Sequence, residues 1–107
     1  MTLATETQLT ISAWADETFG DGGSPARGAA RANEEMAELL AELTKDEPDY
    51  VRVADELADI VIVLYRVATK CEVGLMAEID RKMAINRSRE WRQDGSGHGY
   101  HLSPEQE

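Results

Sequence analysis

The sequence has little cysteine and no long apolar run. Cys71 is its only cysteine, so an internal disulfide and a cysteine-rich zinc site are excluded, and a reducing compartment is favoured. We expect Cys71 to be a buried free thiol. No apolar stretch approaches the roughly 20 residues of a membrane-spanning helix, and Met1–Ala15 lacks a basic segment followed by an apolar one. The expectation is therefore a cytoplasmic protein with no membrane partner.

Positive charge is also scarce. The chain has 11 Lys and Arg residues against 21 Asp and Glu residues, which gives a formal net charge of -10. Such a balance opposes nonspecific binding to nucleic acid, so no nucleic-acid partner is expected. A small anionic ligand is still compatible with it, because a divalent cation held by carboxylates reverses the local field.

Strand patterns are missing as well. No segment alternates apolar and polar residues, whereas helical spacing of apolar residues recurs along the chain. Four helices are expected, over Thr7–Phe19, Arg27–Thr44, Val51–Thr69 and Leu75 to about Trp91. The glycine-rich stretch 94–100 is expected to form a loop and residues 102–107 a flexible tail. We predict an all-α four-helix bundle in a single domain, 1–107, with its core at about 8–92.

The third expected helix has an unusually wide apolar surface. Val63 and Val67 widen its stripe, which contains Val53, Leu57, Ile60, Val61, Leu64 and Ala68. This pattern predicts a largely buried helix. Its solvent side is best represented by Asp55, Ile62 and Arg66.

Acidic residues cluster on the second and third expected helices. Glu34, Glu35 and Glu38 lie three or four residues apart on the second, so their side chains are neighbours. Glu56 and Asp59 lie three apart on the third, among apolar residues. Taken alone, the first group is typical of a solvated acidic face, and the second pair could form structural salt bridges.

Together, the two groups favour a cation site. Helices joined by a short turn can fold back and face each other, which would bring these acids together. A buried carboxylate without a partner costs several kcal/mol, and Mg²⁺ prefers carboxylate oxygens and water as ligands. A bound Mg²⁺ would satisfy the buried acids.

These acids and a later basic segment resemble the MazG-like all-α NTP pyrophosphatase superfamily. The resemblance rests on E-E-x-x-E at 34–38, E-x-x-D at 56–59 and K-x-x-x-N-x-x-R at 82–89, and it extends from about Gln8 to Tyr100. It implies a four-helix MazG-like bundle that assembles as a homodimer or homotetramer. It also implies cleavage of an NTP or dNTP between the α and β phosphates, releasing the monophosphate and pyrophosphate.

The resemblance also implies roles for particular residues. The implied metal ligands, for Mg²⁺ with Mn²⁺ as a substitute, are Glu35, Glu38, Glu56 and Asp59. Glu34 and Glu38 are the implied catalytic acids, near the second metal or the attacking water. The implied substrate contacts are Lys82, Asn86, Arg89 and Trp14. Trp14 and Phe19 could equally be core residues, and the cations near 82–89 could simply complement a helix C-terminus.

Two other functions remain open at this point. The chain could be a nonenzymatic helical interaction module in which the acids make interchain salt bridges. It could also hydrolyse another phosphorylated metabolite, such as phosphoribosyl-ATP.

Overall fold

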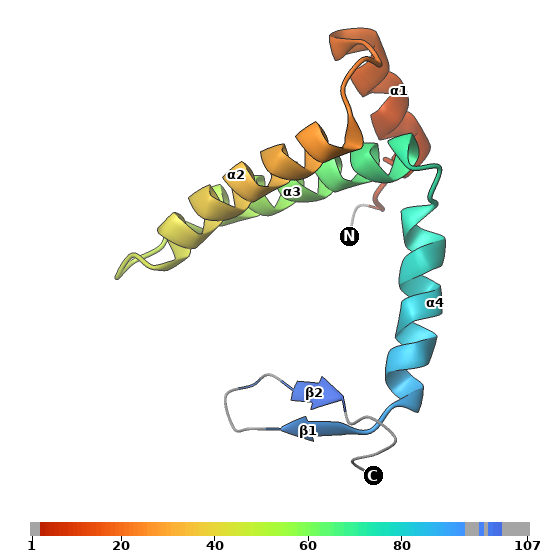
Figure 1. Cartoon of the computed structure of the whole chain (residues 1–107). Helices are drawn as coiled ribbons and strands as arrows, with labels where there is room; N and C mark the ends of the chain where they lie inside the picture. Colours follow the sequence, from red (N-terminus) through yellow and green to blue (C-terminus); the bar gives the residue numbers. More distant parts are fainter. Residues whose placement is uncertain (1–2, 94–96, 98, 102–107) are drawn as a thin grey trace. The chain divides into compact units, whose positions relative to one another are not determined.

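Helices account for most of the chain in the computed structural model, which describes residues 3–93, 97 and 99–101 (Figure 1). In chain order the elements are α1 (Gln8–Phe19), α2 (Pro25–Leu43), α3 (Tyr50–Lys70), α4 (Leu75–Ser88), β1 (Trp91–Gln93) and β2 (Gly99–His101). The expected all-α class and its four helices are confirmed. The two short strands form a hairpin that the sequence pattern did not predict.

Side-chain caps fix where the first three helices begin. The Thr7 hydroxyl accepts a hydrogen bond from the Thr10 backbone N–H at α1, and the Asp49 carboxylate accepts from Val51 at α3. Ser24 caps α2 and Pro25 occupies its first position. The expected start of α2 at Arg27 was therefore two residues late, because proline suits the first turn of a helix.

The chain divides into two units at the junction of Leu75 and Met76. The single domain expected from the sequence stays a prediction. In the first unit α2 lies beside α3, and α1 packs against α3 near its C-terminal end (Figure 1). A side-chain hydrogen bond of 2.7 Å joins Ser12 on α1 to Thr69 on α3. The buried apolar residues of this unit are Ala15, Ala32, Leu39, Ile60 and Ala68.

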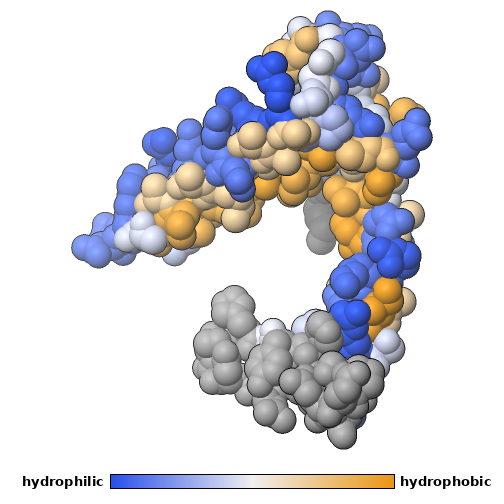
Figure 2. Space-filling model, viewed as in Figure 1, coloured by the Kyte–Doolittle hydropathy of each residue, from blue (hydrophilic) through white to orange (hydrophobic). Residues whose placement is uncertain are grey.

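The third helix is less buried than its apolar pattern predicted. Leu57, Val61 and Leu64 are 50%, 46% and 40% exposed, and only Ile60 and Ala68 of α3 are buried. Figure 2 shows the resulting apolar surface running along the α2–α3 pair. The physical reason is that α1 and α2 cover only part of α3 in the single chain.

The second unit contains α4 and the hairpin. The expected helix to about Trp91 ends instead at Ser88, whose hydroxyl donates to the backbone oxygen of Ile85. Trp91 begins β1, which pairs antiparallel with β2 so that Trp91 lies opposite His101. Gly97, between the two strands, has a φ of 91°, a conformation that glycine adopts readily. The expected tail at 102–107 lies outside the described residues.

The position of Cys71 and the apolar length of the helices both relate to the scarcity of cysteine and of apolar runs in the sequence. Cys71 is exposed, so the expected buried thiol was wrong; the residue follows the last turn of α3 at the surface. Within the described residues, no helix combines the length and apolar character needed to cross a membrane. The cytoplasmic location stays a prediction.

Candidate metal centre and adjoining cavity

Three carboxylates from two helices converge in the first unit. Glu35 and Glu38 project from α2, and Glu56 projects from α3; one oxygen of each lies within 4.8 Å of the others. The i, i+3 spacing on α2 places its two acids on one face, and the helical pairing brings that face to α3. Glu35 is buried at 7% exposure, Glu56 is partly buried and Glu38 is exposed. We call these three residues the carboxylate cluster.

Glu56 is the electrostatically frustrated member of the cluster. Among the described residues its Oε2 is buried without a hydrogen-bond partner. The pKa of Glu56 is raised to about 7, first by a hydrogen bond with the Glu35 side chain, then by desolvation. The charges of Glu38, Glu35 and Asp59 raise it further. A cation would satisfy the unpaired oxygen and reverse the repulsion.

Two of the acids singled out in the sequence lie outside the cluster. Glu34 is exposed and has an oxygen 3.7 Å from the guanidinium of Arg31. Asp59 is exposed too, although its charge acts on Glu56. The ligand and catalytic roles implied for all five acids stay predictions, and the structure brings three of them together.

Arg31 adjoins the cluster and was missed in the sequence. Its Nη2 lies 3.1 Å from Oε1 of Glu35, one helical turn further along α2. The sequence did contain a signal for this pair, because Arg31 lies four residues before Glu35 and side chains so spaced are neighbours on a helix. Arg31 therefore compensates part of the charge that Glu35 brings to the cluster.

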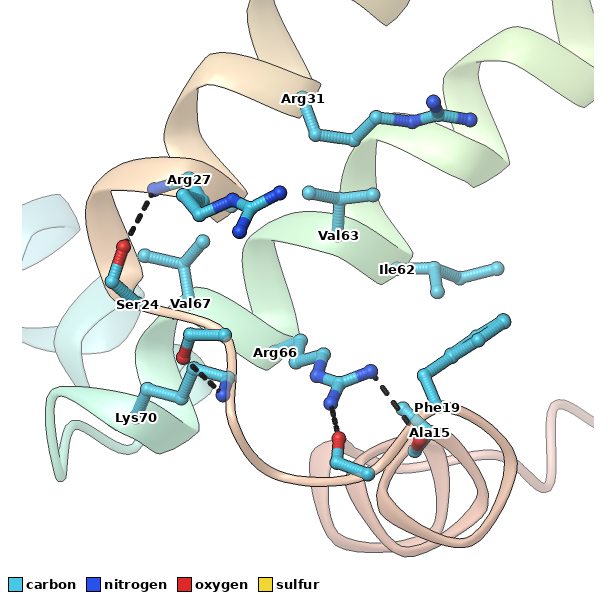
Figure 3. Close-up of a pocket in the computed structure, with 13 residues that line it drawn as sticks. Ala15, Phe19, Ser24, Arg27, Arg31, Ile62, Val63, Arg66, Val67 and Lys70 are labelled. Carbon is cyan, nitrogen blue, oxygen red and sulfur yellow. Dashed lines mark hydrogen bonds between the residues drawn. The ribbon is translucent and has the colours of Figure 1, made fainter.

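A cavity of about 410 Å³ lies beside Arg31, between α1, the loop that follows it, α2 and α3 (Figure 3). Four cations line it, although the chain as a whole is acidic. Its other walls are apolar side chains and loop backbone. The lining residues are Ala15, Phe19, Gly20, Gly23, Ser24, Arg27, Gly28, Arg31, Ile62, Val63, Arg66, Val67 and Lys70.

Two of the four cations fasten the loop that closes one side of the cavity. Arg66 donates to the backbone oxygens of Ala15 and Gly20 and lies 3.6 Å from the Asp16 carboxylate. Lys70 donates to the backbone oxygens of Asp21 and Gly23. Arg66 and Ile62 were expected on the solvent side of α3. Ile62 is 37% exposed, as expected, but the Arg66 side chain is only 21% exposed, because α1 and its loop fold over it.

The two aromatic residues of α1 play different parts. Phe19 lines the cavity, and the guanidinium carbon of Arg66 lies 5.8 Å from its ring centroid. Trp14 meets Phe19 edge to face, with ring centroids 5.5 Å apart, but it does not line the cavity. The predicted substrate contact of Trp14 therefore stays a prediction.

The basic segment implied to contact substrate lies in the second unit. Lys82 and Asn86 are one turn apart on α4, as expected. Arg89 lies beyond the end of α4 at Ser88, although the expected helix extended to about Trp91. The backbone oxygen of Asn86 accepts from Arg89 N–H at 3.3 Å and from Trp91 Nε1 at 2.7 Å. Their contact with substrate stays a prediction.

These features define an all-α protein with a carboxylate cluster suited to a hard divalent cation. No protein-family profile matches the sequence. A dATP/dGTP diphosphohydrolase of Cyanophage S-2L is 32% identical over 97 residues, covering 91% of this chain and 86% of the relative. A dATP/dGTP diphosphohydrolase of Salmonella phage PMBT28 is 34% identical over 97 residues. This chain spans only 31% of the length of that second relative.

A solved structure of a nucleotide-hydrolysing enzyme is also similar to this chain. It is the MazG-like pyrophosphohydrolase of Cyanophage S-2L, bound to dGDP and three catalytic Mn²⁺ ions per active site. The match has a TM-score of 0.73 and 31% identity, and it covers 94% of this chain and all of that one. The chain belongs to the MazG-like nucleotide pyrophosphohydrolases, a family of enzymes.

Proposed function

We propose that this chain is a Mg²⁺-dependent pyrophosphohydrolase that cleaves an NTP or dNTP to the nucleoside monophosphate and pyrophosphate. The observation that carries the proposal is the carboxylate cluster, with the unpaired oxygen of Glu56, beside a cavity lined by cations. Purine deoxynucleotides are the first candidates, because the curated relatives are named dATP/dGTP diphosphohydrolases.

Glu35, Glu38 and Glu56 would hold the metal, with Asp59 as a further ligand. Their donor atoms are all carboxylate oxygens, which suit Mg²⁺ and, as a substitute, Mn²⁺. The solved relative contains Mn²⁺. When bound, the metal supplies Lewis-acid stabilisation of phosphate charge and a water of lowered pKa.

The chain's own residues would position the substrate and accept the proton of the attacking water. A carboxylate of Glu34 or Glu38 that is not occupied by the metal orients the attacking water and accepts its proton. Arg31 offsets charge on the phosphates, in line with its place between the cluster and the cavity. Lys82, Asn86 and Arg89 add phosphate or sugar contacts, since these side chains supply the required donors.

The cavity would take the nucleoside. Its volume of about 410 Å³ lies within the range of small-molecule sites, and apolar walls suit the face of a base. Assembly into a homodimer or homotetramer would cover the apolar surface left on α3.

The proposal is tested by a screen of purified protein with Mg²⁺ against common NTPs, dNTPs and phosphoribosyl-ATP, with pyrophosphate release as the readout. We expect release from at least one nucleoside triphosphate and its loss in Glu38→Gln. Glu47→Gln, an exposed acid in the turn between α2 and α3, is the matched control and should keep full turnover.

Three results would count against the proposal. Turnover of phosphoribosyl-ATP alone would move the function to that metabolite. A complete lack of hydrolysis with stable capture of a protein partner would favour an interaction module. Undiminished turnover in Glu38→Gln would remove the carboxylate cluster from the reaction.

A further inference from the structure

We propose that Arg27 sets the base preference of this site by donating to the two adjacent acceptors of guanine, so that guanine nucleotides are favoured over adenine nucleotides. The inference rests on the proposed function in one respect: the nucleoside occupies the cavity. It concerns a residue that the acidic motifs of the sequence do not include.

Within the part of the chain that the structure describes, Arg27 differs from the other cations of the cavity in its lack of a polar partner. Arg66 and Lys70 are bonded to loop carbonyls, and Arg31 pairs with Glu34 and Glu35. The described residues provide no hydrogen bond or ion pair to the Arg27 guanidinium. In Figure 3 this guanidinium points inward toward Val63, whereas that of Arg66 points at the loop.

Arg27 is exposed, so water satisfies its guanidinium when no ligand is bound. It is the third residue of α2, where the helix dipole disfavours a cation. Its neighbours in the cavity include Val63 and Val67, which offer no acceptor. A ligand with hydrogen-bond acceptors in the cavity would replace this water on the guanidinium.

The donor pattern of arginine decides which base fits. Arginine has five N–H donors in a planar fork and no acceptor. Guanine presents O6 and N7, two acceptors side by side, which the fork can engage together. Adenine presents N7 beside its N6 amino group. This amino group is a donor, so it would face a second donor on the arginine fork and could not bond to it.

The spacing along α2 suits this assignment. Arg27 and Glu35 are eight residues apart, which is a rise of about 12 Å along a helix. Arg31 lies midway and contacts Glu35. A nucleotide with its phosphates at the carboxylate cluster therefore places its base, and not its phosphates, near Arg27.

Binding measurements test the inference without relying on turnover. Affinities for dGDP, dADP and 7-deaza-dGDP are measured by titration calorimetry with Ca²⁺ in place of Mg²⁺. We expect the wild-type protein to bind dGDP about tenfold or more tighter than dADP. Because 7-deaza-dGDP lacks N7, it should bind more weakly than dGDP.

Arg27→Ala and Arg27→Lys form a matched pair. Both should bring the two purine affinities to within about twofold, because lysine keeps the charge but loses the fork. Thermal unfolding of both variants checks that they fold. An equal loss for dGDP and dADP in Arg27→Ala, with recovery in Arg27→Lys, would assign Arg27 to a phosphate and overturn the inference. Wild-type protein without a preference for dGDP would also overturn it.

The experiment separates this inference from the proposed function. Preferential binding of dGDP that depends on Arg27, without pyrophosphate release from any NTP or dNTP under Mg²⁺, would refute the hydrolase and keep the base preference. Pyrophosphate release with no base preference would refute the role of Arg27 and keep the hydrolase.

Discussion

The carboxyl group of Glu56 should make the stability of the folded chain depend on pH. Its pKa is raised from 4.5 to about 7, so between these values the folded chain holds a proton that the unfolded chain has released. This contribution to the free energy of unfolding is complete below about pH 4.5. It declines as the pH rises through 7, because the folded carboxyl group then has to ionise beside Glu35 and Glu38.

The consequence can be measured on metal-free protein. With a chelator present, Glu56→Gln should be more stable than wild type at pH 8, and the difference should shrink toward pH 5. Thermal unfolding of both proteins across this range provides the measurement. Mg²⁺ should raise the stability of the wild type more than that of Glu56→Gln. A difference that does not change with pH would contradict the account.

The residues around the site differ in how far the sequence predicted them. Helix geometry places Glu35 and Glu38, three residues apart, on one face of α2, and the expected pairing of the two helices brings Glu56 to them. The cavity cations were missed, since Arg27 and Arg66 come together only when α1 and its loop fold over α3. No local pattern encodes that placement.

At the scale of elements, Glu42 holds the turn between α2 and α3. It is 3% exposed and accepts hydrogen bonds from the Asp49 backbone N–H at 3.0 Å and from Lys45 Nζ at 2.9 Å. Arg52 Nε lies 3.5 Å away. The Asp49 N–H first, and then Lys45, lower the pKa of Glu42. The turn is therefore tied to a charged carboxylate.

Removing that carboxylate should destabilise the helical pair. We expect the melting temperature to fall in Glu42→Gln and further in Glu42→Ala, because the Asp49 N–H and Lys45 lose their charged acceptor. A lowered pKa stabilises the folded chain above 4.5, and this contribution is lost as the pH falls below that value. The gap between wild type and Glu42→Gln should therefore narrow in acid. An unchanged melting temperature in Glu42→Ala would refute this role.

Gly28 of α2 lies close to Val67 of α3. A Cβ added there would lie 2.6 Å from Cγ2 of Val67, and a β-branched side chain on a helix has little freedom to move aside. Gly28→Ala should destabilise the protein by about 1–3 kcal/mol, despite the higher helix propensity of alanine. Gly22→Ala is the matched control, because its Cβ meets nothing within 4 Å. Denaturant unfolding of the two variants should therefore differ.

The bounds of the elements were predicted where the capping signals were read correctly. The expected start of α3 at Val51 was within one residue of the observed start, next to the Asp49 cap, but the expected start of α2 at Arg27 left out the Ser24 cap and Pro25. The hairpin after α4 was missed, because three-residue strands contain too few positions to establish an alternating pattern.

The whole molecule exposes an apolar face that one chain does not cover. Leu57, Val61 and Leu64 recur at helical spacing on α3 and are half exposed. The sequence predicted burial from this stripe, but it could not show whether a neighbouring helix or another chain provides it. The predicted homodimer or homotetramer would account for the stripe.

Light scattering coupled to size exclusion tests that assembly. We expect the wild type at twice or four times the mass of one chain, and Val61→Glu with Leu64→Glu at a lower mass, because two charges would be buried in the interface. Asp55→Lys, an exposed position on α3, should keep the wild-type mass. A monomeric wild type would contradict the prediction.

Phosphorus NMR of dGTP mixed with the protein and Mg²⁺ tests the central claim most directly, because it identifies both products of the cleaved bond. The account predicts that the triphosphate resonances give way to those of dGMP and pyrophosphate, and that Glu38→Gln leaves them unchanged. Formation of dGDP and orthophosphate, or equal conversion by Glu38→Gln, would contradict it.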